Sequence, residues 1–394
     1  MSRWGRSGRI EQGCHRSGAT QPIMRPMSTS ELPPLSPPST VGSRPSIFDL
    51  SHEQFADWLE QHGERAYRAN QIRRAIFANG VLDFASITTL PAALRSLLAD
   101  EFSIAPSAVR RHLTSSDGTE KLLLELGDRE TLETVLMPEG DRRTVCVSSQ
   151  VGCAMGCVFC ASGLLGVKRN LTVGEMIEQV LRVTSLLPPN ESLTNVVVMG
   201  LGEPMANLAN LRGFLDSLTA ADGFAMSPRR ITVSTVGLPK GMREFASWGQ
   251  PFNLAVSLHA PREELRTEIV PVNRSIGIEA VLDAADDYFE QTGRRVTYEY
   301  VLLAGRNDSA REASELVDLL RGRNAHVNLI PMNAVEQTGL SGSGQPATRA
   351  FAEQLESGGL NVTVRRRRGA DIDAACGQLR LTESAADAPA VALQ

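Results

Sequence analysis

Three cysteines stand close together in the middle of this 394-residue chain, at Cys153, Cys157 and Cys160. Glycines before, between and after them let the backbone turn around a bulky ligand. A structural zinc site takes four ligands, and no fourth Cys or His follows within a plausible distance. A [4Fe-4S] cube held by three cysteines keeps one iron open for a second cofactor. The spacing therefore predicts one [4Fe-4S] cluster on these thiols, with zinc, redox thiols and coincidence as alternatives.

The spacing of these cysteines resembles the signature of the radical S-adenosylmethionine (SAM) superfamily. In that superfamily an electron from the cluster cleaves SAM and leaves a 5'-deoxyadenosyl radical, which abstracts hydrogen from unactivated carbon. Gly202 and Glu203, followed by a proline, resemble the superfamily's Gly-Glu-Pro element, which receives the SAM amino group. Such a tripeptide is usually a tight turn, but here it comes one strand after the cysteine loop. We therefore expect both residues to bind SAM.

Short β-branched segments alternate with amphipathic helical segments from about Gly140 onward. Six such units and one further strand, NVTVRRRR, predict an α/β fold: a partial (β/α)6 TIM-like radical SAM barrel. Working residues of such barrels lie after the carboxyl ends of the strands. Candidates for SAM contacts occupy these positions, although a strand-end Ser is usually a turn and a lone His is usually structural. They are Ser234, Ser257, Leu258, His259 and Asn333.

The remaining chain divides into four segments around this core. Residues 1–46 are rich in Arg, Ser, Pro and Gly without an apolar period, which predicts a disordered, basic N-terminal arm. Apolar residues at three- and four-residue intervals predict a small N-terminal helical domain over residues 47–115. Its arginines, and not this pattern, make it a candidate accessory RNA-binding domain. A β-hairpin linker is expected over 116–139, the barrel core over 140–380 and a tail over 381–394.

Composition limits the possible classes of protein. The hydrophobic content of 42% supports a buried core, and no stretch approaches the roughly 18 consecutive apolar residues of a membrane span. We therefore expect a cytoplasmic protein with no membrane partner, and a monomer. Six cysteines are too few and too clustered for a secreted disulfide scaffold. The net charge of −5 gives no global attraction for nucleic acid, so RNA binding would need local basic patches.

Several unrelated segments between Ser51 and Arg380 resemble the RlmN family of bacterial dual-specificity RNA methyltransferases, among them MGLGEPMANL, NLAVSLHAP and RRRRGADIDAACGQL. The resemblance implies methylation of adenine C2 in 23S rRNA, near the peptidyl transferase centre, and in some tRNAs, beside the anticodon. The relative Cfr, which methylates C8 of the same ribosomal adenine, is the alternative. A radical SAM enzyme for a small molecule or protein and a non-enzymatic iron-sulfur protein are the other classes.

The same resemblance assigns three catalytic roles. Cys376 matches the methyl-carrying cysteine, Cys146 the resolving thiol that forms a transient disulfide with it, and Glu133 the proton acceptor. Two SAM molecules per turnover follow, one as methyl donor and one as radical source. A reducing partner is implied, such as a flavodoxin or ferredoxin system. Without the resemblance, Cys146 would be a small core residue and Glu133 an ordinary solvent-facing carboxylate.

Two groups of arginines are candidates for contact with RNA phosphate. The helical domain has Arg65, Arg68, Arg73 and Arg74, and the last strand has Arg365, Arg366, Arg367 and Arg368. Alternation along a strand would send the last four to opposite faces, so that two reach phosphate and two are solvated or paired. A run of charge is otherwise usually solvated surface.

Overall fold

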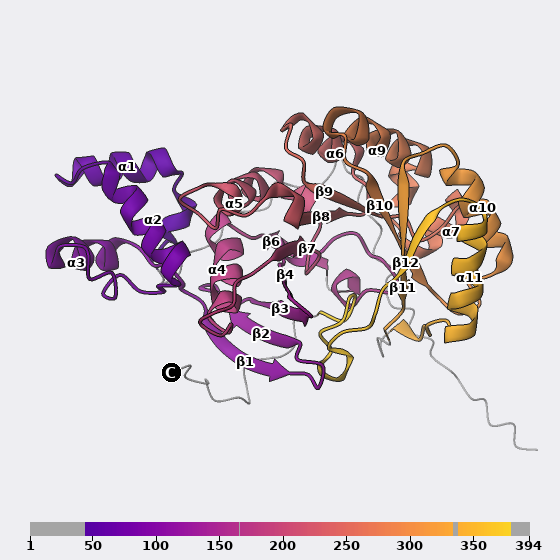
Figure 1. Ribbon diagram of the computed structural model, residues 1–394, viewed down its shortest axis with the longest axis horizontal. Helices are drawn as coiled ribbons and strands as arrows, with labels where there is room; N and C mark the ends of the chain where they lie inside the picture. The colour runs from indigo at the N-terminus through magenta and orange to yellow at the C-terminus, as the bar shows by residue number, and fades with distance from the viewer. Residues whose placement is uncertain (1–43, 165, 334–337, 380–394) are drawn as a thin grey trace, which may run out of the picture.

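The computed structural model describes residues 44–164, 166–333 and 338–379. Nearly all of the predicted arm and the whole predicted tail therefore lie outside the described residues, as does Cys14. Figure 1 shows a group of helices at one end of the molecule, joined to a large curved sheet with further helices around it. Across the described ranges, no helix is both long and apolar enough to cross a membrane.

The N-terminal helices match the predicted helical pattern. They are α1 (His52–Gln61), α2 (Tyr67–Asn79) and α3 (Ala92–Glu101), after a short 3-10 helix, η1 (Ile47–Asp49). Ser51 begins α1 with a capping box. The Ser51 hydroxyl accepts from the backbone N–H of Gln54, and the Gln54 side chain accepts from the backbone N–H of Ser51. Gly80, in the left-handed conformation, ends α2. Their buried faces form one continuous core with the barrel.

One ten-stranded sheet organises the rest of the described chain, in the order β1-β2-β3-β4-β7-β8-β9-β10-β11-β12. Pairing is antiparallel from β1 to β4 and parallel from β4 to β12, so the predicted parallel barrel is confirmed. The strands are β1 (Ala108–Thr114), β2 (Glu120–Glu125), β3 (Thr131–Glu139), β4 (Arg142–Cys146), β7 (Asn195–Val198), β8 (Ile231–Thr235), β9 (Asn253–Ser257), β10 (Val296–Leu302), β11 (Ala325–Pro331) and β12 (Asn361–Val364).

Helices follow the parallel strands and cover the outside of the sheet (Figure 1). They are α4 (Val173–Thr184), α5 (Leu208–Thr219), α6 (Pro239–Ser247), α7 (Glu263–Ile269), α8 (Asn273–Ile276), α9 (Ile278–Thr292), α10 (Ala310–Leu320) and α11 (Gln345–Ser357). Along β7, β8 and β11, buried side chains on the helix-covered face alternate with less buried side chains on the inner face. In β8, Ile231 and Val233 are buried, whereas Thr232 and Ser234 on the opposite face are half-buried. The inner face of the barrel is therefore polar and accessible.

Two segments differ from the sequence-based expectation. Strand β1 lies inside the range assigned to the helical domain, and the predicted hairpin, β2 with β3, continues the main sheet instead of standing apart as a linker. Strand β12 ends at Val364, so the expected alternation of Arg365 to Arg368 along a strand is wrong. The chain leaves the sheet there, and Gly369, with φ of 59°, lies in the turn that follows, where its N–H donates to Asp117 between β1 and β2.

Candidate active site

The cysteine loop begins where β4 ends. A two-stranded sheet of β5 (Gln150–Cys153) and β6 (Gly166–Asn170) frames it, and Cys153 pairs with Gly166. A Cβ at Gly152 would lie 2.0 Å from the carbonyl oxygen of Gly166, and Gly152 also has φ of 79°, so only glycine fits. The Cys160 N–H donates to the carbonyl of Cys157 at 3.2 Å. This local folding places the three predicted cluster ligands on one short loop.

The three thiols lie in one another's electrostatic field. Burial raises the pKa of Cys153 to about 12 and raises that of Cys157 well above its usual range, with a further contribution from the neighbouring cysteines. Thiols in this setting ionise when a metal centre compensates their charge. Backbone N–H groups of Met155 and Gly202 point at the Cys153 sulfur. Among the described residues, no three or more His, Cys, Asp or Glu side chains converge on a site for a single metal ion.

Gly202 and Glu203 follow β7 and lie next to the cysteine loop. Gly202 has φ of 103°, and a Cβ there would lie 2.7 Å from the backbone nitrogen of Gln150. The Glu203 carboxylate accepts from the N–H of Met205 at 2.9 Å and of Val236 at 2.8 Å. Burial raises the pKa of Glu203 to about 7. Glu203 thus fixes the loops after β7 and β8, and its charge faces Cys153.

The other predicted SAM residues lie at the carboxyl ends of the next strands. Ser234 and Ser257 are half-buried, and Leu258 is fully buried. His259 accepts at Nδ1 from the N–H of Val301 at 3.1 Å, and its ring meets Phe159 edge-on with centroids 4.7 Å apart. Burial lowers the pKa of His259 to about 3, so the ring is neutral at physiological pH. The imidazole therefore ties β9 to β10 and packs against the cysteine loop.

Asn333 follows β11 and contacts the loop that contains Cys376. Its Nδ2 donates to the carbonyl oxygen of Cys376 at 3.1 Å. Its Oδ1 is buried and has no hydrogen-bond partner within the described part of the chain. A buried acceptor without a partner is costly, and a ligand that offers an N–H donor removes that cost. This atom fits the adenine or amino group of SAM.

The segment after β12, residues 369–379, carries Cys376 and is called the carrier loop below. It docks against the cysteine loop: the N–H of Ala161 donates to the carbonyl of Gly377 at 2.8 Å, and the Ser162 hydroxyl donates to the carbonyl of Leu379 at 2.9 Å. Cys376 itself is half-buried, with a free thiol. The carrier loop therefore lies against the cysteine loop, although the bonded residues Ser162 and Leu379 are 217 positions apart in sequence.

Cys146 and Glu133 project from the same face of the sheet. Cys146 of β4 pairs with Val135 of β3, and Glu133 shares the face of Val135 because side chains alternate along a strand. Burial raises the pKa of Cys146 to about 12, and the nearby charge of Cys376 raises it further. The two cysteines that the resemblance pairs are therefore neighbours, with both thiols free.

Glu133 is a buried, ion-paired carboxylate, with only 2% of its side chain exposed, which excludes a solvent-facing position. Its Oε1 lies 2.9 Å from Nζ of Lys121 on β2. The same ammonium donates to the backbone carbonyl of Asp373 in the carrier loop, at 3.1 Å. One lysine therefore joins the predicted proton acceptor to the loop of the predicted methyl carrier. Sequence analysis missed Lys121, because a lysine at the start of the apolar run KLLLEL usually faces solvent.

Arg266 of α7 is a second buried charge that the sequence did not reveal. Its guanidinium donates to the carbonyls of Val236 at 2.6 Å and of Ser257 and Leu258 at 3.1 Å each. Burial lowers its pKa to about 10. It holds the ends of β8 and β9 together and presents positive charge to Cys157. The only sequence signal is an arginine next to Leu265 on a short helix, which is too common to single out.

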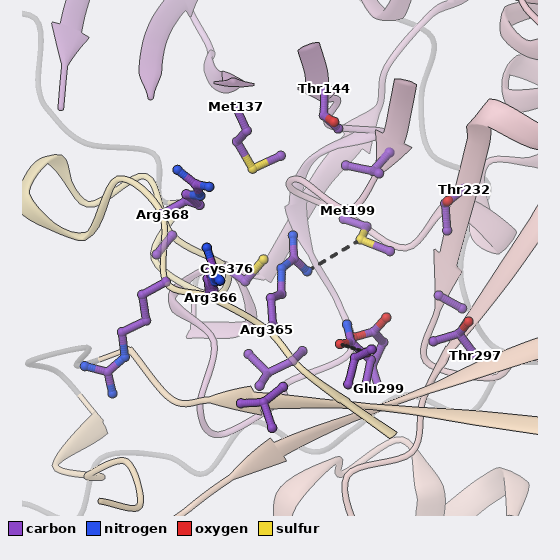
Figure 2. A pocket seen from close by; sticks show the side chains of 18 of the residues that line it. Met137, Thr144, Met199, Thr232, Thr297, Glu299, Arg365, Arg366, Arg368 and Cys376 are labelled. Atoms are coloured by element: carbon purple, nitrogen blue, oxygen red, sulfur yellow. Dashed lines mark hydrogen bonds between the residues drawn. The ribbon is translucent and has the colours of Figure 1, made fainter. Parts of the chain in front are cut away.

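A cavity of about 750 Å³ occupies the inner face of the barrel beneath Cys376. Figure 2 shows its wall, where Arg365, Arg366 and Arg368 lie near Cys376 and threonines project from the strands. The lining includes residues near the starts of several strands, such as Thr232 and Thr297. Five arginines and two glutamates line the cavity, so its charge is predominantly positive: the arginines are Arg142 and Arg365 to Arg368, and the glutamates Glu139 and Glu299.

The arginines of the helical domain divide into paired and exposed side chains. Arg73 is buried and bonded to Asp222 at 2.6 Å, which fixes the helical domain to the segment after α5. Arg68 lies 3.4 Å from Glu64 and donates to Gln71. Arg65 and Arg74 are exposed. Arg73 therefore has a structural role and is not a phosphate ligand. The exposed Arg65 and Arg74 stay candidates for contact with RNA phosphate.

Comparison with known proteins identifies the family. The family model for the radical SAM superfamily matches residues 147–317, and that for the ribosomal RNA large subunit methyltransferase N-terminal domain matches residues 46–104. A probable dual-specificity RNA methyltransferase RlmN of Rhodopirellula baltica is 49% identical over 358 residues, 91% of this chain and 96% of that protein. The chain belongs to the RlmN family. The RlmN proteins of Geobacillus kaustophilus and Bacillus subtilis are 43% and 42% identical, over 92% and 86% of this chain and 98% and 94% of their own lengths.

A solved structure supports the same RlmN assignment. A radical SAM methyltransferase from Sphaerobacter thermophilus superposes with a TM-score of 0.84 at 42% identity, covering 86% of this chain and all of that one. RlmN membership makes this chain a radical SAM methyltransferase and implies a [4Fe-4S] cluster and SAM. The cysteine loop and the unpartnered Asn333 Oδ1 fit these two groups.

Proposed function

We propose that this enzyme methylates C2 of adenine in 23S rRNA and in tRNA, through a methyl group carried first on Cys376. The observation that carries the proposal is the convergence of two free thiols, Cys376 and Cys146, beside the cysteine loop. A radical SAM enzyme that only abstracts hydrogen needs no methyl carrier. C2 of adenine is an electron-poor sp2 carbon, which cannot itself attack the methyl group of SAM.

SAM is held at the carboxyl ends of β7, β8, β9 and β11 in this proposal. Gly202 and Glu203 receive its amino group, while Ser234, Ser257 and the backbone around Leu258 and His259 face its ribose and carboxylate. Asn333 Oδ1 accepts a donor from its adenine. Cys153, Cys157 and Cys160 hold the cluster, which when bound supplies the electron that cleaves SAM to a 5'-deoxyadenosyl radical.

The first half-reaction loads the methyl group. The Cys376 thiolate attacks the methyl carbon of one SAM, forms a sulfur-carbon bond and releases S-adenosylhomocysteine. Half-burial of Cys376 and the docking of Gly377 against Ala161 keep the sulfur next to the SAM site. Loading needs no RNA, so it can be measured on its own.

The second half-reaction transfers the methyl carbon. Hydrogen abstraction from S-methyl Cys376, with a second SAM as radical source, leaves a methylene radical that adds to C2 and tethers the RNA. The adduct radical then gives up one electron, which the cluster, when bound, would take back. Glu133 accepts the proton that leaves C2. Cys146 attacks the Cys376 sulfur, which forms a disulfide and releases the methylated RNA. A reducing partner of the flavodoxin or ferredoxin type completes the cycle, since both the disulfide and the cluster need electrons.

Substrate RNA approaches through the positively charged cavity. Arg366 and Arg367 are exposed at its edge, whereas Arg368 is paired with Glu139 at 2.9 Å. Arg65 and Arg74 are exposed on the helical domain. Together the exposed arginines offer local positive charge on a chain whose net charge is −5, which is the arrangement needed to bind phosphate.

Nucleotide-resolution mass spectrometry after reaction with both RNAs tests the proposed function. We expect 2-methyladenosine in 23S rRNA and in tRNA, and its loss from a strain that lacks the gene. Detection of 8-methyladenosine instead would assign the chain to the Cfr activity. Retention of 2-methyladenosine in the deletion strain would contradict the proposal.

A further inference from the structure

Arg365 differs from the three arginines that follow it. Its backbone N–H donates to the carbonyl of Leu329 at 2.8 Å, which continues the pairing of β12 with β11 by one bond and directs the side chain into the barrel. Arg366 and Arg367 are exposed. In Figure 2 the Arg365 guanidinium lies beside the Cys376 sulfur, and its Nη1 lies 4.0 Å from the sulfur of Met199.

The groups that face Arg365 are negatively charged or become so. They come from three elements: Cys376 on the carrier loop, Glu299 on β10 and Cys146 on β4. The charge of Cys376 has the largest effect in raising the pKa of Arg365, and the charges of Glu299 and Cys146 also raise it. Glu299 accepts from Asn328 Nδ2 at 2.8 Å, which fixes its carboxylate at the inner wall. Arg365 thus lies between one fixed carboxylate and two thiols.

Both proposed thiol steps need a thiolate, and at Cys146 burial disfavours one. The pKa of Cys146 is raised to about 12 by burial, and the positive charge of Arg365 opposes that rise. A guanidinium stays protonated under all physiological conditions, so it stabilises a thiolate without exchanging a proton with it. A phosphate contact, in contrast, would require the side chain to leave Glu299 and both sulfurs.

We propose that Arg365 is a catalytic residue that stabilises the thiolates of Cys376 and Cys146, and that it does not bind RNA phosphate. The inference rests on the proposed function and deepens it. During loading, the Cys376 proton goes to water, its sulfur bonds to the methyl carbon and the sulfonium bond of SAM breaks. During resolution, the Cys146 thiolate bonds to the Cys376 sulfur, the bond from that sulfur to the RNA-linked methylene breaks, and the methylene takes a proton.

Thiol alkylation of the full-length holoenzyme, without RNA, tests the role of Arg365 directly. Iodoacetamide labelling of Cys376 is followed by peptide mass spectrometry as a function of pH. For Arg365→Gln we expect labelling at pH 7 to slow by about tenfold or more, with its pH profile displaced to higher pH, because loss of an opposite charge this close shifts a thiol pKa by about one unit or more. Arg365→Lys should restore most of the rate. An exposed arginine of α11 that does not line the cavity supplies the control, Arg349→Gln, which should label like wild type.

Identical pH profiles for wild type and a cluster-loaded Arg365→Gln variant would overturn the inference. SAM-dependent S-methylation of Cys376, measured in parallel, distinguishes failure of the proposed function from failure of the role of Arg365. If wild type forms no S-methyl Cys376, the proposed function fails whatever the alkylation profiles show. If wild type is methylated and Arg365→Gln is methylated at the same rate, only the role of Arg365 fails. A tenfold or greater loss of S-methylation in Arg365→Gln, rescued by Arg365→Lys, supports it.

Discussion

Replacement of Lys121 by methionine removes one charge from the centre of the proposed site and leaves an unbranched side chain that is one atom shorter. The Lys121 ammonium is 7% exposed, lies 2.9 Å from the carboxylate of Glu133 and donates to the carbonyl of Asp373. The substitution therefore leaves a buried carboxylate without its ammonium partner and a carrier loop without one of its hydrogen bonds. Glu133, the proposed acceptor of the C2 proton, then lacks the ammonium that holds its carboxylate in place.

The expected loss of stability follows from these contacts. Breaking a buried ion pair by removing one partner costs about 3–5 kcal/mol when the remaining charge stays ionised. The lost bond to the Asp373 carbonyl adds about 1 kcal/mol. We expect Lys121→Met to lower the free energy of unfolding by about 4 kcal/mol or more at neutral pH, measured by denaturant titration of the cluster-loaded protein.

Activity provides the sharper measurement for Lys121→Met. We expect Cys376 to be methylated, while the covalent protein-RNA adduct resolves slowly, because Glu133 and the carrier loop lose the ammonium that joins them. Lys121→Arg, which keeps the charge, is the control. The reasoning is refuted if Lys121→Met resolves the adduct at the wild-type rate at every pH.

Three further predictions concern the cysteines. Cys146→Ala should accumulate a covalent adduct between Cys376 and RNA on a denaturing gel; absence of any adduct would remove the resolving role. Cys376→Ala should assemble the cluster, seen by its visible absorption, but transfer no methyl group, and residual transfer would refute the carrier assignment. Because burial raises the pKa of Cys146 to about 12, its thiolate fraction and the resolution rate should rise about tenfold per pH unit between neutral pH and pH 9. A rate independent of pH over that window would exclude attack by this thiol.

The placement of the site at one end of the barrel could be predicted from the sequence. Parallel strands bring their carboxyl ends to one edge, so residues as distant as Cys153 and Asn333 had to lie near each other once the strands were recognised. The period-two and period-3.6 patterns were sufficient for β4, for β7 to β12 and for α4, α5, α9 and α10. Short α6 and strand β1 were missed, because few turns or few alternating residues give a weak pattern.

The partners of buried charges could not be predicted. Lys121, Arg266 and Arg365 each look like surface residues in sequence, and their neighbours come from segments far away in the chain. The same limit applies to Arg73, whose pairing with Asp222 excludes it from phosphate binding. Periodicity specifies which face a residue occupies but not which charge it meets there.

The central claim is that the methyl carbon passes through Cys376 on its way to adenine. Reaction of the holoenzyme with SAM carrying a fully deuterated methyl group, followed by mass spectrometry of the modified adenosine and of 5'-deoxyadenosine, tests it most directly. Passage through S-methyl Cys376 predicts that the RNA methyl group retains two of the three deuterium atoms and that the third appears in 5'-deoxyadenosine. Retention of all three deuterium atoms in the RNA would contradict it.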